Sequence, residues 1–143
     1  MDAIKLLTSD HDEVRGLFDQ FRTAKEKNDS ERMHDLQRQI FDELETHTRI
    51  EEDIFYPAVR ELGDDDLTET VTEGKQEHHV VDVLMREIRD LSDQAIFEAK
   101  MTVLMENVEH HADEEESELF PELREKMTQE RLDELGRELE AAK

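Results

Sequence analysis

The sequence contains no cysteine and no tryptophan, and it has only four glycines, two prolines and one tyrosine in 143 residues. The lack of cysteine excludes disulfide frameworks, zinc ribbons and thiol chemistry. No apolar run approaches the roughly 20 residues that a membrane span requires. The first residues, MDAIKLL, lack the basic and apolar regions of a signal peptide. These absences predict a soluble protein of the cytoplasm.

Positive charge is also scarce. The chain has 18 Lys and Arg against 41 Asp and Glu, which gives a formal net charge of −23 at pH 7. Such a surface repels nucleic acid and anionic membranes, so neither is expected as a partner. Repulsion between copies favours a monomer at low salt. A salt-rich cytoplasm would screen this charge, and an ordinary acidic protein fits the composition equally well.

The length and composition predict a single all-α domain over residues 1–143. Glu, Leu, Arg, Met and Ala dominate, and these residues favour helix over strand. Ser30 and Asp66 are expected as helix N-caps, and LSDQ at 91–94 and KMTQ at 126–129 mark further breaks. We therefore expect a short lead-in at 2–7 and a core bundle over about 9–125. Its helices are expected at 9–27, 30–62, 66–91 and 93–125, with a tail helix over about 128–142.

Each of the four main helices carries an apolar stripe with spacings of three and four residues, which marks its core-facing side. The stripes are His11, Val14, Phe18 and Phe21; Leu36, Ile40, Leu44, His47, Glu51, Ile54 and Ala58; Val71, Gly74, His78, Val81, Met85 and Ile88; and Phe97, Met101, Leu104, Val108, His111, Glu115 and Leu119. Four such helices with short loops predict an up-down-up-down four-helix bundle. The tail helix is expected to pack across its outside.

The two halves of the chain resemble each other. HTRIEEDIFYP at 47–57 shares its His, both Glu and its Pro with HADEEESELFP at 111–121. DHDEVRGLF at 10–18 likewise aligns with EHHVVDVLM at 77–85. The bundle is therefore predicted to contain two copies of a helix pair, each with one isolated His and one His-x-x-x-Glu.

Helical geometry separates the histidines into two groups. Those on the apolar stripes face the core, whereas His34, His79 and His110 share faces with charged residues. Glu51 and Glu115 each follow a stripe histidine by four residues and so lie beside it. Glu52 and Glu116 are turned by about 100° to the flank, where they are placed to hydrogen-bond the inner set. The predicted inner polar residues are His11, His47, Glu51, His78, His111 and Glu115.

Six buried polar groups of this kind require a positive partner, because an unpaired buried carboxylate is costly. No lysine or arginine lies on the stripes at this level, whereas metal ions supply the charge and use every group. Imidazole and carboxylate suit iron, zinc, copper and manganese. If both glutamates bridge two metals, an oxo or hydroxo bridge brings each to five ligands and leaves one position open. That count favours iron meeting a small oxidant.

Other interpretations of these residues are weaker. Hydrogen-bonded core histidines and snorkelling glutamates would explain any one position, but not six matched ones. A ferritin-type site needs two Glu-x-x-His motifs, and only Glu31 to His34 fits, on a polar face. Pro57 and Pro121 are expected to bend their helices past the site. Tyr56 is expected to pack in the bundle, with a hydrogen bond into the site as the lesser alternative.

With these motifs the chain resembles the hemerythrin-like family, the HHE cation-binding domains, from DH at 10–11 to HADEEESELFP. The resemblance implies that the six inner residues bind two iron ions with an oxo or hydroxo bridge. Oxygen-carrying hemerythrins have a fifth histidine where this chain has Gly74, and they place the last carboxylate five residues after its histidine instead of four. The chain is therefore more similar to the four-His, two-Glu branch, which is associated with peroxide, nitric oxide, oxygen sensing and iron handling.

Three functions follow as alternatives. The first is a redox-active di-iron protein acting on hydrogen peroxide, nitric oxide or dioxygen; as an enzyme it would be catalase-like or reduce nitric oxide with an electron donor still to be identified. The second is non-enzymatic binding or sensing of oxygen or nitric oxide, or iron storage and delivery. The third is a metal-free acidic helical scaffold. No catalytic residue is singled out beyond the six ligands, and zinc and manganese suit the same ligand types.

Overall fold

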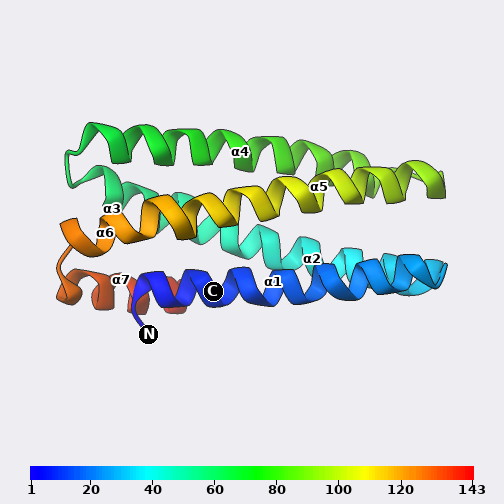
Figure 1. The fold of residues 1–143 in the computed structure, drawn as a ribbon, viewed down its shortest axis with the longest axis horizontal. Helices are drawn as coiled ribbons and strands as arrows, with labels where there is room; N and C mark the ends of the chain where they lie inside the picture. Colours follow the sequence, from blue (N-terminus) through cyan, green and yellow to red (C-terminus); the bar gives the residue numbers. More distant parts are fainter.

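Four long helices lie side by side along the long axis of the molecule (Figure 1). The computed structural model describes all 143 residues and contains no strand. The long helices are α1 (Ala3–Glu26), α2 (Ser30–Ile50), α4 (Asp65–Arg89) and α5 (Gln94–Glu114). Short turns join consecutive helices, which therefore run antiparallel, and the predicted all-α bundle is confirmed. None of these helices combines the length and the apolar character that crossing a membrane requires.

The long helices and the tail helix have N-cap residues whose side-chain oxygens accept hydrogen bonds from the first turn. Asp2 accepts a hydrogen bond from the backbone N–H of Lys5 at the start of α1. Asp29, Asp64 and Asp93 do the same for α2, α4 and α5, and Thr128 does so for α7 (Gln129–Ala142). The predicted N-caps Ser30 and Asp66 are wrong. The earlier aspartates reach the first free N–H groups of the helix, so that both predicted residues lie inside it.

The predicted separate lead-in at 2–7 is also wrong, because α1 runs without a break from Ala3. Its first two turns are buried against the tail helix α7, in one apolar cluster with Leu132, Leu135 and Leu139. Gly136 permits this close approach, since a Cβ at that position would lie 2.2 Å from the carbonyl oxygen of Met1. The tail helix therefore packs on the outside of the bundle, as predicted. Its apolar residues bury those of the first two turns of α1, and this packing stabilises the helix from Ala3 onward.

Each of the two repeated motifs ends in a wide π-helical turn. The turn η1 (Glu51–Phe55) leads from α2 into α3 (Tyr56–Arg60), and η2 (Glu115–Leu119) leads from α5 into α6 (Phe120–Lys126). In η1 the N–H of Tyr56 donates to the carbonyl of Glu51, five residues back, and Phe120 does the same to Glu115 in η2. A proline without an N–H follows each aromatic residue. The interruption predicted at Pro57 and Pro121 takes this form.

The extra residue in η1 rotates everything beyond it around the helix axis. Regular α-periodicity places Ile54 on the core stripe, but Ile54 is only half-buried. Phe55 and Tyr56 are 0% and 1% exposed instead. The π-helical turn therefore turns an aromatic ring and a phenol hydroxyl toward the polar residues of the core.

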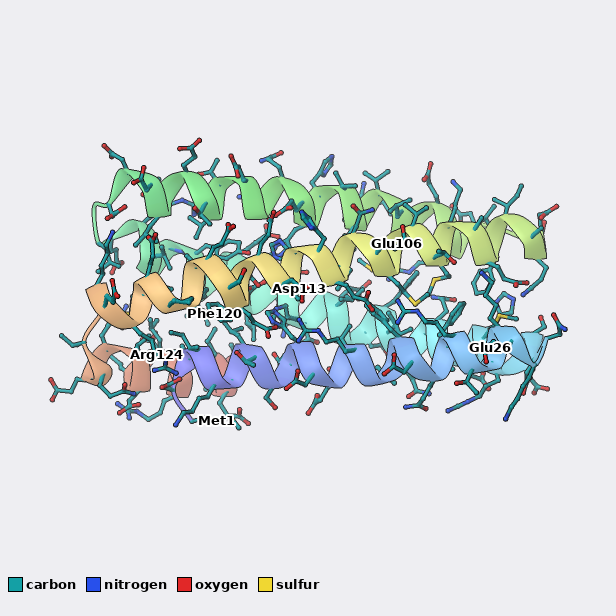
Figure 2. All side chains as sticks on the ribbon, in the orientation of Figure 1. Met1, Glu26, Glu106, Asp113, Phe120 and Arg124 are labelled. Carbon is teal, nitrogen blue, oxygen red and sulfur yellow. The ribbon has the colours of Figure 1, made fainter.

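A polar layer divides the apolar core in two. One cluster of 18 buried residues gathers the start of α1, α3, α6 and α7, and another of 16 gathers the far ends of the four long helices. Between them lie the buried histidines and glutamates. Acidic side chains such as Glu106 and Asp113 project from the outer face into solvent (Figure 2).

Candidate metal centre

The six predicted inner residues meet in the middle of the bundle. Each is less than a tenth exposed, and each of the four long helices supplies one histidine. The neighbouring His79 and His110 are exposed, as predicted. His34 is half-buried but lies apart, where it stacks on Phe97 with ring centroids 4.1 Å apart. Helical periodicity therefore selected the correct member of each His-His pair for burial.

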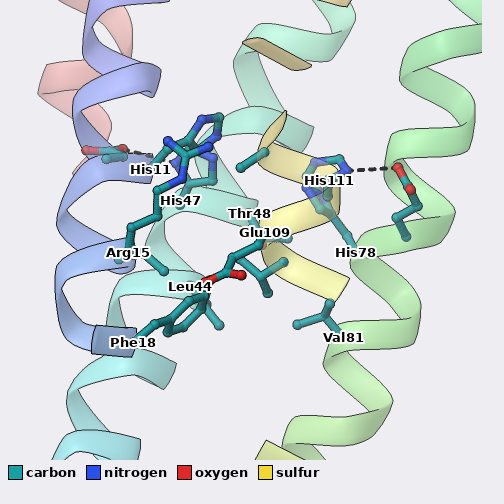
Figure 3. Close-up of a pocket in the computed structure, with 15 residues that line it drawn as sticks. His11, Arg15, Phe18, Leu44, His47, Thr48, His78, Val81, Glu109 and His111 are labelled. Atoms are coloured by element: carbon teal, nitrogen blue, oxygen red, sulfur yellow. Dashed lines mark hydrogen bonds and ion pairs between the residues drawn. The ribbon is translucent and has the colours of Figure 1, made fainter. Parts of the chain in front are cut away.

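The four imidazoles form two pairs. The ring centroids of His11 and His47 lie 4.9 Å apart, and those of His78 and His111 lie 4.8 Å apart. Figure 3 shows the two pairs on opposite sides of a pocket. This arrangement offers two binding positions, each with two ring nitrogens.

The two buried glutamates lie between these pairs. Glu51 Oε1 is 3.1 Å from Nε2 of both His47 and His78. Glu115 Oε1 is 3.2 Å from His11 Nε2 and 3.5 Å from His111 Nε2. Each carboxylate therefore contacts one histidine from either pair, which is the placement of a bridging ligand.

Four buried atoms of this cluster make no hydrogen bond of suitable geometry, although both Nε2 atoms among them lie within 3.2 Å of a carboxylate oxygen. They are His11 Nε2, His47 Nε2, Glu51 Oε2 and Glu115 Oε1. An unpaired polar atom in a protein interior costs about 1–3 kcal/mol, so four in one place require an explanation. Imidazole nitrogens and carboxylate oxygens together fit a pair of transition-metal ions, which would engage all four.

Protons and metal ions compete for this cluster. Burial lowers the pKa of His47, but Glu51 and Asp10 outweigh it and raise the pKa to about 10. Burial also opposes protonation of His111, yet Glu115 and Glu51 raise its pKa to about 11. Burial, together with the charge of Glu51, raises the pKa of the Glu115 carboxyl. A bound metal would replace these protons, so metal affinity here depends on pH.

Every inner histidine has a carboxylate behind it. In each case the imidazole Nδ1–H donates to an Asp or Glu oxygen, which turns the Nε2 lone pair toward the centre. The pairs are His11 with Glu116 at 2.7 Å, His47 with Asp10 at 3.1 Å, His78 with Glu52 at 2.9 Å, and His111 with Glu77 at 2.8 Å.

Two of these outer carboxylates were missed by periodicity. Glu52 and Glu116 lie at the flank as predicted, but nothing in the stripes points to Asp10 or Glu77. A signal is present in the repeat, since each acid directly precedes a buried histidine, in DHDEVRGLF and in EHHVVDVLM. Acids that occupy the same place in both copies are candidates for a shared task.

Tyr56 requires a correction, because it does more than pack. Its hydroxyl donates to Glu115 Oε2 at 2.8 Å and lies 3.3 Å from His111 Nε2 and 3.5 Å from His78 Nε2. Burial raises the pKa of this phenol well above its usual value, and the charges of Glu51 and Glu115 add to the effect. A Cβ on Gly74 would lie only 2.9 Å from the hydroxyl oxygen, so the glycine makes room for it.

A small cavity adjoins the four imidazoles, with a volume of about 40 Å³ (Figure 3). Beyond the histidines its walls are mainly apolar, with contributions from Val14, Phe18, Leu44, Val81 and Val108. A molecule of a few atoms fits such a space, because one water needs roughly 10–15 Å³ on the same measure. This cavity therefore offers room for a small molecule beside the polar centre.

Comparisons with known proteins show which proteins the chain resembles. A "DNA nickase" of Nostoc sp. is 28% identical over 145 residues, which cover all of this chain but only 39% of that protein. Uncharacterized proteins of Mycobacterium tuberculosis and Mycobacterium bovis are each 33% identical over 121 residues, which is 85% of this chain and 71% of theirs. No solved structure matches the chain. The model of the hemerythrin HHE cation binding domain matches residues 2–123, and the chain belongs to this family.

Proposed function

We propose that the chain is a non-haem di-iron protein that binds and reacts with a small oxidant in the core of its bundle. One observation carries this proposal: two imidazole pairs flank two buried carboxylates, and four of their atoms make no hydrogen bond of suitable geometry. No lysine or arginine forms an ion pair with either glutamate, whose ion-pair partners are the four buried histidines. Metal ions in the centre would compensate the negative charge of the two buried carboxylates, which otherwise repel each other.

The six residues divide naturally between two ions. His11 and His47 would hold one iron, His78 and His111 the other, and Glu51 and Glu115 would be shared. With an oxo or hydroxo bridge, each iron would have five ligands and would keep one position for a small molecule. Iron, when bound, supplies the electrons that the oxidant takes up. The histidines are held in place by their outer carboxylates, whose contacts fix each ring nitrogen toward the centre.

The substrate class follows from the space available. A cavity of about 40 Å³ with largely apolar walls has room for hydrogen peroxide, nitric oxide or dioxygen. Val14, Leu44 and Val81 keep bulk water away from this side of the imidazoles. The specificity of the site would therefore rest on size and on the metals.

The Tyr56 hydroxyl is a neutral hydrogen-bond donor that faces the centre. Its raised pKa keeps the phenol protonated, so it serves as a hydrogen-bond donor at its oxygen and does not become an anionic ligand. Reduction of peroxide or nitric oxide consumes protons, and this hydroxyl lies within 3.5 Å of two ligand imidazoles. It would stabilise negative charge that develops on the oxidant.

We do not extend the name of the Nostoc relative to this chain. A net charge of −23 opposes binding to the phosphate backbone. We propose instead a monomeric protein of the cytoplasm with a small-molecule ligand, an electron donor still to be identified, and neither nucleic acid nor membrane as a partner.

The first test is metal content with the near-ultraviolet spectrum of protein purified in air. About two irons per chain with oxo-to-iron charge-transfer bands are expected. Steady-state consumption of hydrogen peroxide and of nitric oxide is then compared with free iron at the same concentration. Turnover no faster than free iron, together with a stable reversible oxygen adduct, would favour binding or sensing instead. Zinc in place of iron would remove the redox role, because Zn²⁺ has no redox chemistry.

The two His-His pairs provide matched controls. His78→Ala and His111→Ala remove buried imidazoles and are expected to lose iron and turnover together. His79→Ala and His110→Ala make the same chemical change one residue away on the exposed face, and both are expected to keep two irons. Equal behaviour of neighbours, or no metal even after anaerobic iron loading, would leave only a helical scaffold.

A further inference from the structure

The four outer carboxylates follow the internal repeat of the chain. Asp10 and Glu77 occupy matching places in the two copies, and so do Glu52 and Glu116. The hydrogen bonds match as well, because one acid of each kind supports one histidine in each imidazole pair. If only these outer carboxylates differed between the two metal positions, the positions would be nearly equivalent.

The cations behind these carboxylates break this equivalence. Arg15 Nη1 lies 2.9 Å from Glu116 Oε2, the oxygen that also accepts from His11. Lys143 Nζ lies 2.5 Å from Asp10 Oδ1, while the other oxygen of Asp10 accepts from His47. Both histidines of the first pair are therefore backed by an ion-paired carboxylate. Figure 3 shows the Arg15 side chain reaching up beside His11.

The second pair lacks such cations. Neither Glu52, behind His78, nor Glu77, behind His111, forms an ion pair with a lysine or arginine. The nearby His110 pairs with Glu114 instead, at 2.9 Å. In the aligned repeat the place of Arg15 is taken by Asp82, so a base in one half corresponds to an acid in the other.

The difference alters the donor strength of the imidazoles. A carboxylate that accepts the Nδ1–H of a ligand histidine raises the basicity of the ring and strengthens its donation to the metal. A cation bonded to the same carboxylate draws electron density away and weakens that effect. The positive charge also favours an added electron nearby by direct Coulomb attraction. Both effects act in the same direction at His11 and His47.

We propose that Arg15 and Lys143 are positioning residues that make the two irons electronically distinct. The iron held by His11 and His47 accepts the first electron and becomes ferrous, while the iron held by His78 and His111 remains ferric. This inference rests on the proposed di-iron function. It assigns an order to reduction: Fe(III)Fe(III) takes one electron to give a valence-localised Fe(II)Fe(III) state, and a second electron gives Fe(II)Fe(II).

Tyr56 acts against this order. Its hydroxyl donates to Glu115 Oε2 beside His78 and His111, which weakens donation from that oxygen. It is one neutral donor on a shared ligand, however, whereas Arg15 and Lys143 bring two full charges to one side. Charge-assisted hydrogen bonds are roughly twice as strong as neutral ones. The cations are therefore expected to decide the order.

The experiment is a reductive titration of the iron-loaded full chain with dithionite and redox mediators, followed by electron paramagnetic resonance of the mixed-valence state. The variants are Arg15→Gln and Lys143→Gln on the cationic side and Glu77→Gln on the other. Arg22→Gln is the matched control, because Arg22 lies on the same helix and pairs with Asp19 and Glu109, neither of which forms a hydrogen bond or ion pair with the six residues. Iron content and the diferric spectrum are measured first in each protein.

Arg15→Gln is expected to lower the first reduction potential more than the second and to reduce the comproportionation constant about tenfold, a change of about 59 mV. Lys143→Gln, which acts through Asp10 alone, is expected to shift the potentials in the same direction. Glu77→Gln is expected to raise the second potential and also to reduce the constant. Arg22→Gln is expected to change neither potential measurably.

Two results would overturn the inference while leaving the di-iron function intact. One is an equal shift of both potentials in Arg15→Gln and Lys143→Gln. The other is the same response in Arg22→Gln, which would reduce the effect to net charge. A wild-type chain without iron would overturn both this inference and the proposed function, and the initial metal analysis distinguishes that case.

Discussion

The two imidazole pairs offer the centre the same donors in different surroundings. In the first, the ring of Phe120 stacks on His11 with centroids 6.0 Å apart and an interplanar angle of 8°. In the second, Tyr56 stacks on His78 at 5.5 Å and 13°. The aromatic residues occupy matching places in the repeat, yet only Tyr56 carries a hydroxyl. The two copies of the repeat thus share the histidines and glutamates that would bind metal. They differ in the neighbouring side chains that would tune the metals.

The residues near the two aromatic rings also differ in polarity and in the space they leave. Gly74 faces the Tyr56 hydroxyl, whereas the aligned position in the first copy is the fully buried Leu7. One half therefore has room for a polar group, and the other is filled with hydrocarbon. The second pair therefore has a hydrogen-bond donor beside it, whereas the first pair has the positive charges of Arg15 and Lys143.

The largest expected effect comes from removing what the halves share. Glu51→Ala deletes a carboxylate that contacts both pairs, so both metals should bind more than about 100-fold more weakly. Glu52→Gln changes only the support of His78, and a loss of roughly 10–100-fold is expected, mainly at the second position. Titration with Co²⁺ measures both. A Glu51→Ala protein that retains two tight sites would refute the shared role.

Next in size is the response of the apo-protein to pH. His47 and His111, one from each pair, have pKa values raised from 6.5 to about 10 and about 11. The folded chain therefore holds protons that the unfolded chain releases, and stability that is fully present below about pH 6.5 is lost as pH rises toward these values. Each histidine accounts for about 1–2 kcal/mol per pH unit.

Urea unfolding of apo- and metal-loaded protein between pH 6 and 9 tests this dependence. The loaded protein has no such protons to lose, so the stabilisation by metal should grow with pH. Replacing His47 by Gln should remove about half of the slope, and replacing His111 by Gln the other half. An apo-protein that becomes more stable on raising the pH would contradict the assignment of these protons.

A smaller effect is expected from filling the space that Gly74 leaves beside the Tyr56 hydroxyl. In Gly74→Ala the new Cβ would lie 2.9 Å from the Tyr56 oxygen, and such overpacking costs about 1–3 kcal/mol. The double variant with Tyr56→Phe should recover most of the loss. Gly16→Ala is the control, because its Cβ meets nothing within 4 Å and should stabilise the helix by about 0.5–1 kcal/mol. Additive losses in the double variant would disprove the contact.

The smallest effect is expected from Tyr56→Phe alone. It makes the second aromatic position chemically like the first and leaves Glu115 Oε2 without its donor. A net loss of about 1 kcal/mol is expected in urea unfolding of the apo-protein, with iron content unchanged. If the variant loses iron as His111→Ala does, the hydroxyl has a larger part in metal binding than the geometry indicates.

The sequence predicted the inner six residues because they lie on uninterrupted α-helix, where a spacing of three and four fixes the direction of a side chain. It failed at Tyr56, since the π-helical turn inserts a residue that α-periodicity does not contain. It also missed Lys143, which meets Asp10 across a separation of 133 residues. Contacts of that kind depend on how helices approach one another, and no local pattern records them.

The polar layer also has a mechanical consequence for the bundle. It separates two apolar clusters of similar size, each with its own packed rings, so the apo-protein has its weakest cohesion at mid-height. Such a molecule should open in two cooperative units, visible in native-state hydrogen exchange as separate sets of amides with different opening free energies. Metal bound across all four long helices would join those units into one, and the two exchange classes should then merge.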